Sequence, residues 1–215
     1  AVVYVDDTLL VVDKPSGLLA VPGRGADKQD CLSARVQARY TDALIVHRLD
    51  MATSGLMVMA RGTAAQRALS MAFAARAVTK RYVAMVAGRV EAPAQDGGMP
   101  DDWGSIDLPL IVDWPNRPRR IVDHLSGKPS LTRWRVLGHD EAGLNTRVEL
   151  EPVTGRSHQL RVHLRELGHP ILGDALYAPP DVQALSGRLL LHAQSLRFAH
   201  PLTGAALAFE SAVPF

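Results

Sequence analysis

The apolar residues of this chain fall mostly into short, strand-like runs separated by turn residues, with few long helical stretches between them. Runs of this kind are typical of strands that bury one or both faces in a sheet. The segments with this pattern are Val2–Val5, Leu9–Asp13, 43–46, 56–60, 81–88, 132–138, 145–152 and a C-terminal hairpin that turns at Pro201–Gly204. Because many of these runs follow one another directly, a sheet dominates the predicted fold.

Helical periodicity is confined to three segments, 32–39, Thr63 to about Val78, and 155–168. About nine strands with three or four helices, many strands being joined without a helix, indicate an α+β fold. We therefore expect a mixed, largely antiparallel central β-sheet flanked by helices. The Pro- and Gly-rich segment 89–102 is predicted to be a surface excursion rather than a linker, which leaves a single domain over 1–215.

The composition and the missing motifs exclude several classes of protein. With 47% hydrophobic and 21% charged residues, the 215-residue chain can bury a core and is not expected to be disordered. The single cysteine, Cys31, excludes an internal disulfide and a cysteine-rich zinc site. Neither GxGxxG after a strand nor a GxxxxGKS or GxxxxGKT sequence occurs, so the usual phosphate cradles of dinucleotides and nucleoside triphosphates are missing.

The sequence also bears on location and on metal binding. No apolar run approaches the roughly 20 residues that cross a bilayer, and the first residues do not resemble a signal peptide. We therefore expect a cytoplasmic protein without membrane contact. His158 and His163 lie five residues apart on a predicted helix, about 500° around its axis, so they do not share a face. We expect neither a metal nor another cofactor, and a metal-dependent hydrolase using Asp50 is kept as an alternative.

Basic residues gather in two segments, although the net charge is only +2. From Asn116 to Arg135 there are six basic residues and one acid, and 154–165 holds three arginines and no acid. An enzyme that grips phosphates shows such clusters. A solvated face whose neutralising acids lie elsewhere in the sequence explains them equally well.

Polar side chains interrupt apolar runs at three places. In "HRLDMATSG" (47–55), between "ALIV" and "LMVMA", Asp50 either caps a turn or is partly desolvated and then needs a nearby cation to stay ionised. In "KRYVAMVAG", Tyr82 opens an apolar strand, either as a core aromatic or as a surface on which a flipped base stacks. In "VTGRSHQLRVH", Arg156 precedes a helix, where it either faces solvent or binds a carboxylate or phosphate.

In this order and spacing, the three segments resemble the motifs of the RluA-type pseudouridine synthases, over nearly the whole chain. "KPSGLLAVPG" and "HPILGDALYA" fit the same pattern, and "DWPNRP" resembles the RluA subgroup itself. The resemblance implies an RNA pseudouridine synthase acting on a loop uridine of bacterial 23S rRNA, of the tRNA anticodon loop, or of both. Such an enzyme breaks the C1′–N1 bond, turns the uracil and reattaches it through C5, without cofactor or metal.

The resemblance also implies a role for individual side chains. Asp50 would be the nucleophile, Arg156 the cation that pairs with it, and Tyr82 the ring that stacks on the target base. Arg48 would displace the target nucleotide, whereas His47 stays open between pocket support and phosphate contact. The remaining expected substrate contacts are the apolar pocket walls Ile171 and Leu172 and the basic residues Arg119, Arg120 and Arg161.

Three further expectations concern organisation. The subgroup that the chain resembles lacks an S4 RNA-binding domain, so we expect the catalytic domain alone to bind RNA. We expect a monomer without an obligatory protein partner. A catalytically silent RNA-binding protein on the same scaffold is the main alternative function.

Overall fold

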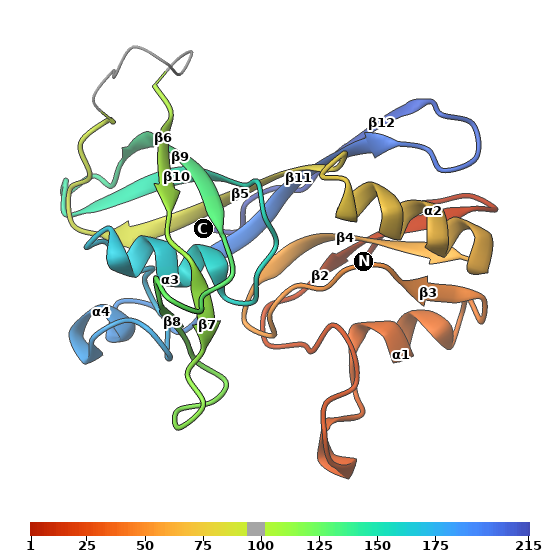
Figure 1. Ribbon diagram of the computed structural model, residues 1–215, viewed down its shortest axis with the longest axis horizontal. Helices are drawn as coiled ribbons and strands as arrows, with labels where there is room; N and C mark the ends of the chain where they lie inside the picture. The colour runs from red at the N-terminus through yellow and green to blue at the C-terminus, as the bar shows by residue number, and fades with distance from the viewer. Residues whose placement is uncertain (94–101) are drawn as a thin grey trace. The chain divides into compact units, whose positions relative to one another are not determined.

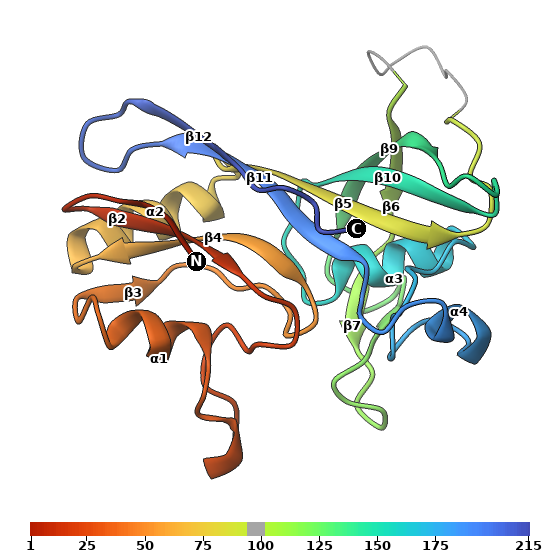
Figure 2. The same ribbon diagram turned by 180° about the vertical axis from the view of Figure 1, so that it is seen from behind.

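The computed structural model describes residues 1–93 and 102–215 as two compact units (Figure 1 and, from behind, Figure 2). Unit 1 comprises Ala1–Lys80 with His192–Pro214, and unit 2 comprises Arg81–Leu191 with Phe215. Most of the predicted surface excursion at 89–102 lies outside the described residues. The expectation of one catalytic domain over 1–215 stays a prediction.

Unit 1 contains the N-terminal elements and the C-terminal hairpin. These are β1 (Val2–Val5), β2 (Leu9–Lys14), a 3-10 helix (Ala26–Lys28), α1 (Leu32–Gln37), β3 (Ala43–Ile45), β4 (Ser54–Arg61), α2 (Thr63–Ala74), β11 (Leu191–Ala199, from His192 on) and β12 (Ala206–Glu210). The strands follow the order β1-β2-β4-β11, with β3 paired to β4 and β12 to β11. In the described part of unit 1, β4 and β11 run parallel and the other strand pairs are antiparallel.

The core of unit 1 lies between this sheet and α2. Leu56 and Val58 of β4 pack in one apolar cluster with Leu69 of α2. The next residues along the strand, Met57 and Met59, point to the opposite face and are also fully buried. Because both faces of β4 are covered, its sequence is a continuous apolar run and not an alternating one.

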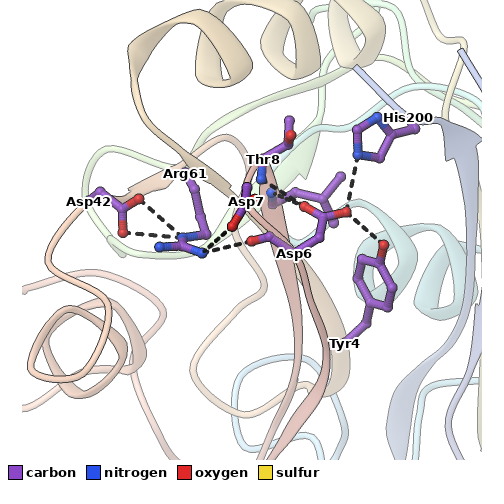
Figure 3. Close-up of polar contacts among 8 residues, drawn as sticks. Tyr4, Asp6, Asp7, Thr8, Asp42, Arg61 and His200 are labelled. Atoms are coloured by element: carbon purple, nitrogen blue, oxygen red, sulfur yellow. Dashed lines mark hydrogen bonds and ion pairs between the residues drawn. The ribbon is translucent and has the colours of Figure 1, made fainter. Parts of the chain in front are cut away.

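A polar cluster fixes the turn between β1 and β2 (Figure 3). The Asp6 carboxylate accepts hydrogen bonds from the Tyr4 hydroxyl (2.6 Å), from the amides of Thr8 and Leu9, and from His200 Nε2 (3.1 Å). Burial alone would raise the pKa of Asp6, but these hydrogen bonds outweigh it and lower the pKa to about 2. The first turn of unit 1 is thereby tied to the end of β11.

Unit 2 contains the remaining elements. These are β5 (Thr79–Ala87, from Arg81 on), β6 (Gly104–Asp107), β7 (Leu110–Val112), β8 (Arg120–Val122), β9 (Leu131–His139), β10 (Asn145–Pro152), α3 (Gln159–Glu166) and α4 (Pro180–Ala184). One antiparallel sheet has the order β5-β10-β9-β6, and β7 and β8 form a separate antiparallel hairpin.

One face of the larger sheet of unit 2 carries a ladder of ion pairs. Arg135 pairs with Glu149 (2.6 Å), and Arg133 with Glu151 (3.6 Å), both across β9 and β10. Arg81 also pairs with Glu151 (2.7 Å). The two arginines of β9 were part of the predicted basic cluster 116–135, and glutamates on the neighbouring strand neutralise them. For these two residues the solvated-face interpretation of the cluster is therefore correct.

The predicted fold class, α+β with a mixed and mostly antiparallel sheet, is confirmed. The predicted strands all occur, with bounds shifted by a few residues, and the C-terminal hairpin forms. The predicted helix from Thr63 ends at Ala74, and Arg76 takes a left-handed φ of 58° that a helix cannot continue through. The short strands β6, β7 and β8 and the helix α4 are additional to the prediction.

Candidate active site

Asp50 lies in the loop 46–53 that joins β3 to β4 in unit 1, and its side chain is half-buried. The main chain directly after Asp50 is held by residues from the end of β2 and the turn after β2. Lys14 Nζ donates to the Met51 carbonyl (3.0 Å), the Gly17 amide donates to the same oxygen (2.9 Å), and Ser16 Oγ donates to the Ala52 carbonyl (2.6 Å). The "KPSG" and "HRLDMATSG" sequences therefore form one structural element.

Lys14 is the centre of this element. It has no exposed surface, and its ammonium group also donates to the carbonyls of Pro15 (2.9 Å) and Leu18 (2.7 Å). A buried ammonium group is stable only where such acceptors surround it. Its charge and its hydrogen bonds hold the backbone next to Asp50, a role that sequence reasoning missed because the partners are backbone atoms.

The chain leaves the Asp50 loop through Ser54 and Gly55. Ser54 Oγ hydrogen-bonds His192 Nδ1 (2.9 Å) on β11. Gly55 has a φ of 114°, and a Cβ there would lie 2.3 Å from the Ala193 carbonyl oxygen. Only glycine allows β4 to approach β11 this closely, so the last residues of "HRLDMATSG" set a strand junction and not only a turn.

His47 and Arg48 occupy the entrance of the same loop. His47 Nε2 accepts a hydrogen bond from the Val58 amide (3.1 Å), and its ring stacks on Phe73 at 4.4 Å. Burial, with a smaller contribution from the charge of Lys80, lowers the pKa of His47 to about 3, so the ring is neutral at pH 7. A neutral, packed imidazole favours pocket support over phosphate contact. Arg48 is exposed.

Tyr82 lies on β5 in unit 2, opposite Leu150 of β10, and is 9% exposed. The predicted apolar pocket walls are placed beside the same strand. Ile171 is 1% exposed and bridges to Val86, and the Leu172 amide donates to the Met85 carbonyl (3.0 Å). Unit 2 thus brings the predicted aromatic ring and both apolar side chains to one strand.

Arg156 is exposed and lies in the loop before α3. The helix begins at Gln159, later than the sequence predicts, because His158 takes a left-handed φ of 58°. Gln159 Oε1 accepts from the Arg156 amide (3.0 Å) and from Thr154 Oγ1 (2.8 Å). Its Nε2 donates to the Leu131 carbonyl (3.0 Å). This buried amide side chain organises the arginine loop and was not singled out from the sequence.

Arg161 is buried rather than displayed for RNA. Its guanidinium forms two hydrogen bonds with the Asp174 carboxylate, at 2.8 and 2.6 Å, and both side chains are at most 5% exposed. Such a bidentate pair keeps both charges stable inside the protein. The burial and the paired carboxylate argue against the predicted contact between Arg161 and RNA. Asp174, in "HPILGD", links that segment to α3.

The other two predicted RNA contacts are half-buried: Arg119 directly precedes β8, and Arg120 begins it. The Arg119 guanidinium lies 5.6 Å from the centre of the Tyr177 ring, and the Arg120 amide donates to the Tyr177 hydroxyl (2.8 Å). Among the described residues, no carboxylate forms an ion pair with either arginine.

The two histidines considered as metal ligands each have hydrogen-bond partners from the protein. His158 Nδ1 lies 2.6 Å from the Tyr177 hydroxyl, and His163 bonds Thr132 Oγ1 and the Leu108 carbonyl. Within residues 1–93 and 102–215, no group of three His, Cys, Asp or Glu side chains is arranged to hold a metal ion. No helix in these same ranges has the length and apolar character needed to span a membrane.

Comparisons with known proteins agree with the resemblance in the sequence. The family model of RNA pseudouridylate synthases matches residues 8–166. The chain is 49% identical over 214 residues to the dual-specificity RNA pseudouridine synthase RluA of Yersinia pestis, covering 100% of this chain and 99% of that protein. It is 48% identical over 214 residues to RluA of Escherichia coli K12, covering 100% of this chain and 93% of that protein.

Solved structures give the same fold. Human RNA pseudouridylate synthase domain containing 1 superposes with a TM-score of 0.76 at 30% identity, covering 100% of this chain and 84% of that one. Human RNA pseudouridylate synthase domain containing 4 superposes with a TM-score of 0.74 at 24% identity, covering 99% and 88%. The second likeness concerns the fold alone. The chain belongs to the RNA pseudouridylate synthase family of isomerases.

Proposed function

We propose that the protein isomerises a loop uridine in 23S rRNA, in the tRNA anticodon loop, or in both, with Asp50 as the nucleophile. The dual specificity stated for the relatives of Yersinia pestis and Escherichia coli supports the pair of substrates. The observation that carries the role of Asp50 is the bracing of its loop by Lys14 and Ser16. A reacting carboxylate must be held within a fraction of an ångström, and this loop has the supports to do so.

The reaction conserves all atoms. The C1′–N1 glycosidic bond breaks, the uracil turns, C5 bonds to C1′, and the proton displaced from C5 is balanced by one gained at N1. A carboxylate serves this sequence in one of three ways: adding to the sugar, adding to the base, or removing a proton at C2′. Each route needs Asp50 ionised and needs the base outside its stack, which costs least for a loop uridine.

The remaining roles follow the family resemblance. Tyr82 stacks on the target base, and Arg156 stabilises the ionised form of Asp50. Ile171 and Leu172 supply apolar pocket surface, and exposed Arg48 takes the place of the displaced nucleotide. His47 supports the loop from within, as its packing against Phe73 favours. The catalytic domain acts as a cytoplasmic monomer without an obligatory protein partner.

The test is release of tritium from RNA labelled with tritium at C5 of uridine. Wild type is expected to release tritium, whereas Asp50→Asn should turn over at least about a thousandfold more slowly, because an amide is a poor nucleophile. RNA binding should be retained. Asp30→Asn, which alters an exposed aspartate paired with Arg35, is the matched control and should match wild type.

Two outcomes would decide against this proposal. If wild type binds RNA yet releases no tritium, the catalytically silent RNA-binding alternative is correct. If Asp50→Asn keeps substantial turnover, the protein is a synthase but Asp50 is not its nucleophile.

A further inference from the structure

We propose that the tip of the β7–β8 hairpin, residues 113–119, is an RNA-binding element in which Trp114 stacks on an unpaired base. This inference rests on the proposed RNA substrate and adds a contact outside the residues assigned above. In both views the hairpin projects from the body of unit 2, with α3 on the side opposite its tip (Figure 1, Figure 2).

Trp114 is exposed in a way that the other two tryptophans are not. It is 65% exposed, whereas Trp134 is 7% exposed. The guanidinium carbons of Arg81 and Arg135 lie 4.4 and 4.9 Å from the ring centre of Trp103. Leaving a large aromatic surface in water is unfavourable, and tryptophan is enriched at binding interfaces. The exposed ring of Trp114 is therefore suited to bind a ligand that is itself flat.

A cation already covers part of this ring. The guanidinium carbon of Arg117 lies 4.6 Å from the ring centre of Trp114, and Arg117 Nε donates to the Trp114 carbonyl (3.1 Å). A base that stacks on Trp114 would meet the aromatic surface and the guanidinium together. Aromatic rings and stacked guanidinium planes are the surfaces on which proteins hold unpaired bases.

The backbone of the tip is fixed before any ligand binds. The Asp113 amide donates to the Arg119 carbonyl (3.0 Å), and the Arg119 amide donates to the Asn116 carbonyl (3.0 Å). The Asn116 side-chain amide also donates to the Asp113 carboxylate (3.0 Å). Because these bonds order the turn in advance, stacking on Trp114 costs little loss of loop freedom.

The base of the hairpin is anchored in the core of unit 2. Leu110 of β7 packs in one buried cluster with Val162 of α3 and Tyr177. The Tyr177 hydroxyl accepts from the Arg120 amide (2.8 Å), and Leu110 and Lys128 exchange two backbone hydrogen bonds. The tip therefore projects from a rigid support.

The charge of the hairpin favours RNA over a protein with an apolar surface. In the described part of the chain, no carboxylate forms an ion pair with Arg117, Arg119 or Lys128. Asp113 and Asp123 accept hydrogen bonds within their own turns. Cations without carboxylate partners next to an exposed aromatic ring match a chain of phosphates and unpaired bases.

The test measures the affinity of the 215-residue chain for an anticodon stem-loop RNA and for a fully paired duplex of the same length as that RNA. Trp114→Ala should weaken stem-loop binding about tenfold or more, since one stacked base contributes about that much. Trp114→Phe should stay within about threefold of wild type, because it keeps an aromatic face. Leu125→Ala is the matched control: Leu125 is 98% exposed beyond β8, is not aromatic, and should leave affinity unchanged.

Three further readouts separate stacking from charge and from loss of folding. Trp114→Ala should raise KM for the stem-loop with little change in kcat, and it should not alter duplex binding. Arg117→Ala should reduce the slope of log affinity against log salt by about one. The difference in fluorescence between wild type and Trp114→Phe isolates the emission of Trp114. Bound stem-loop RNA should protect this emission from quenching by iodide.

The inference is wrong if Trp114→Ala binds the stem-loop within twofold of wild type, or if the RNA does not protect Trp114 from iodide. Either result would indicate that the exposed Trp114 ring binds a protein partner instead of RNA. Both outcomes are distinct from failure of the proposed function, which is decided by tritium release from wild type at saturating RNA.

Discussion

The loop that carries Asp50 and the tip of the β7–β8 hairpin are both short polar connections between strands. The Asp50 loop is held by side chains from a distant segment: Lys14 and Ser16 donate to carbonyls more than thirty residues further along the chain. The hairpin tip is held by bonds among its own residues, from Asp113 to Arg119. One loop is fixed by the surrounding fold, and the other is fixed by itself and exposed at its end.

This difference matches what each loop is proposed to do. A nucleophile needs a position defined to a fraction of an ångström, which a braced backbone provides. A binding tip needs exposed surface and a rigid base, and it tolerates small displacements because stacking has no strict geometry. Changes that loosen the Asp50 loop should therefore reduce kcat, whereas changes at the hairpin should act on RNA affinity.

The largest effect is expected for Lys14→Met. Methionine fills most of the space but leaves the carbonyls of Pro15, Leu18 and Met51 without the ammonium donor. The free energy of unfolding should fall by about 3 kcal/mol or more. In the folded fraction, kcat should fall more than about tenfold because the backbone next to Asp50 is released.

Urea denaturation and tritium release measure these two effects. Lys28→Met replaces an exposed lysine and is the control. It should leave both the free energy of unfolding and kcat close to those of wild type. If Lys14→Met is destabilised but its kcat equals that of wild type, the lysine supports the fold only, and the proposed distinction between the two loops fails.

The role of Lys14, which the sequence did not predict, shows the limit of sequence patterns. The strands were found because their apolar runs are visible locally, and β6, β7 and β8 were missed because they are three or four residues long and lie among prolines and arginines. The "KPSG" sequence follows the predicted strand Leu9–Asp13 and contributes to the family resemblance. Its bonds to Met51 and Ala52 end on backbone oxygens, which no residue type reveals.

The basic residues show the same limit. Arg133 and Arg135 belong to a segment with six cations, yet glutamates of β10 neutralise them through strand register. Arg161 is removed from the surface by Asp174, thirteen positions away. Charge counted along the sequence could not separate these residues from Arg117 and Arg119, because the partner acids come from other elements.

A smaller effect is expected from the pH dependence of the Asp50 loop. His47 has a folded-state pKa of about 3, below its ordinary value of 6.5, so the unfolded chain binds a proton between these values that the folded chain does not. The free energy of unfolding should therefore decrease as pH falls from about 6.5, by on the order of 1 to 2 kcal/mol at pH 5.

His47→Gln is the comparison for this effect. Glutamine can still accept from the Val58 amide but does not titrate, so its stability should vary less between pH 7 and pH 5. Protonation of Asp6 lowers the free energy of unfolding only below about pH 4, so measurements above pH 5 exclude its contribution. Equal slopes for wild type and His47→Gln would mean that the imidazole is not buried as described.

The smallest effect is expected at the base of the hairpin. Tyr177→Phe keeps the ring packed with Leu110 and Val162 but removes the hydroxyl that accepts from the Arg120 amide and hydrogen-bonds His158 Nδ1. The loss of these bonds should cost at least about 1 kcal/mol of stability. If the anchored base serves to hold Trp114 for RNA, stem-loop affinity should also fall a few-fold, with kcat at saturating RNA close to that of wild type. In the double variant Trp114→Ala with Tyr177→Phe, the second substitution should lower RNA affinity little further, because the ring that Tyr177 helps to position is already absent. Fully additive losses of affinity would mean that the base and the tip of the hairpin act on RNA independently. In that case the rigidity of the hairpin does not prepare Trp114 for binding.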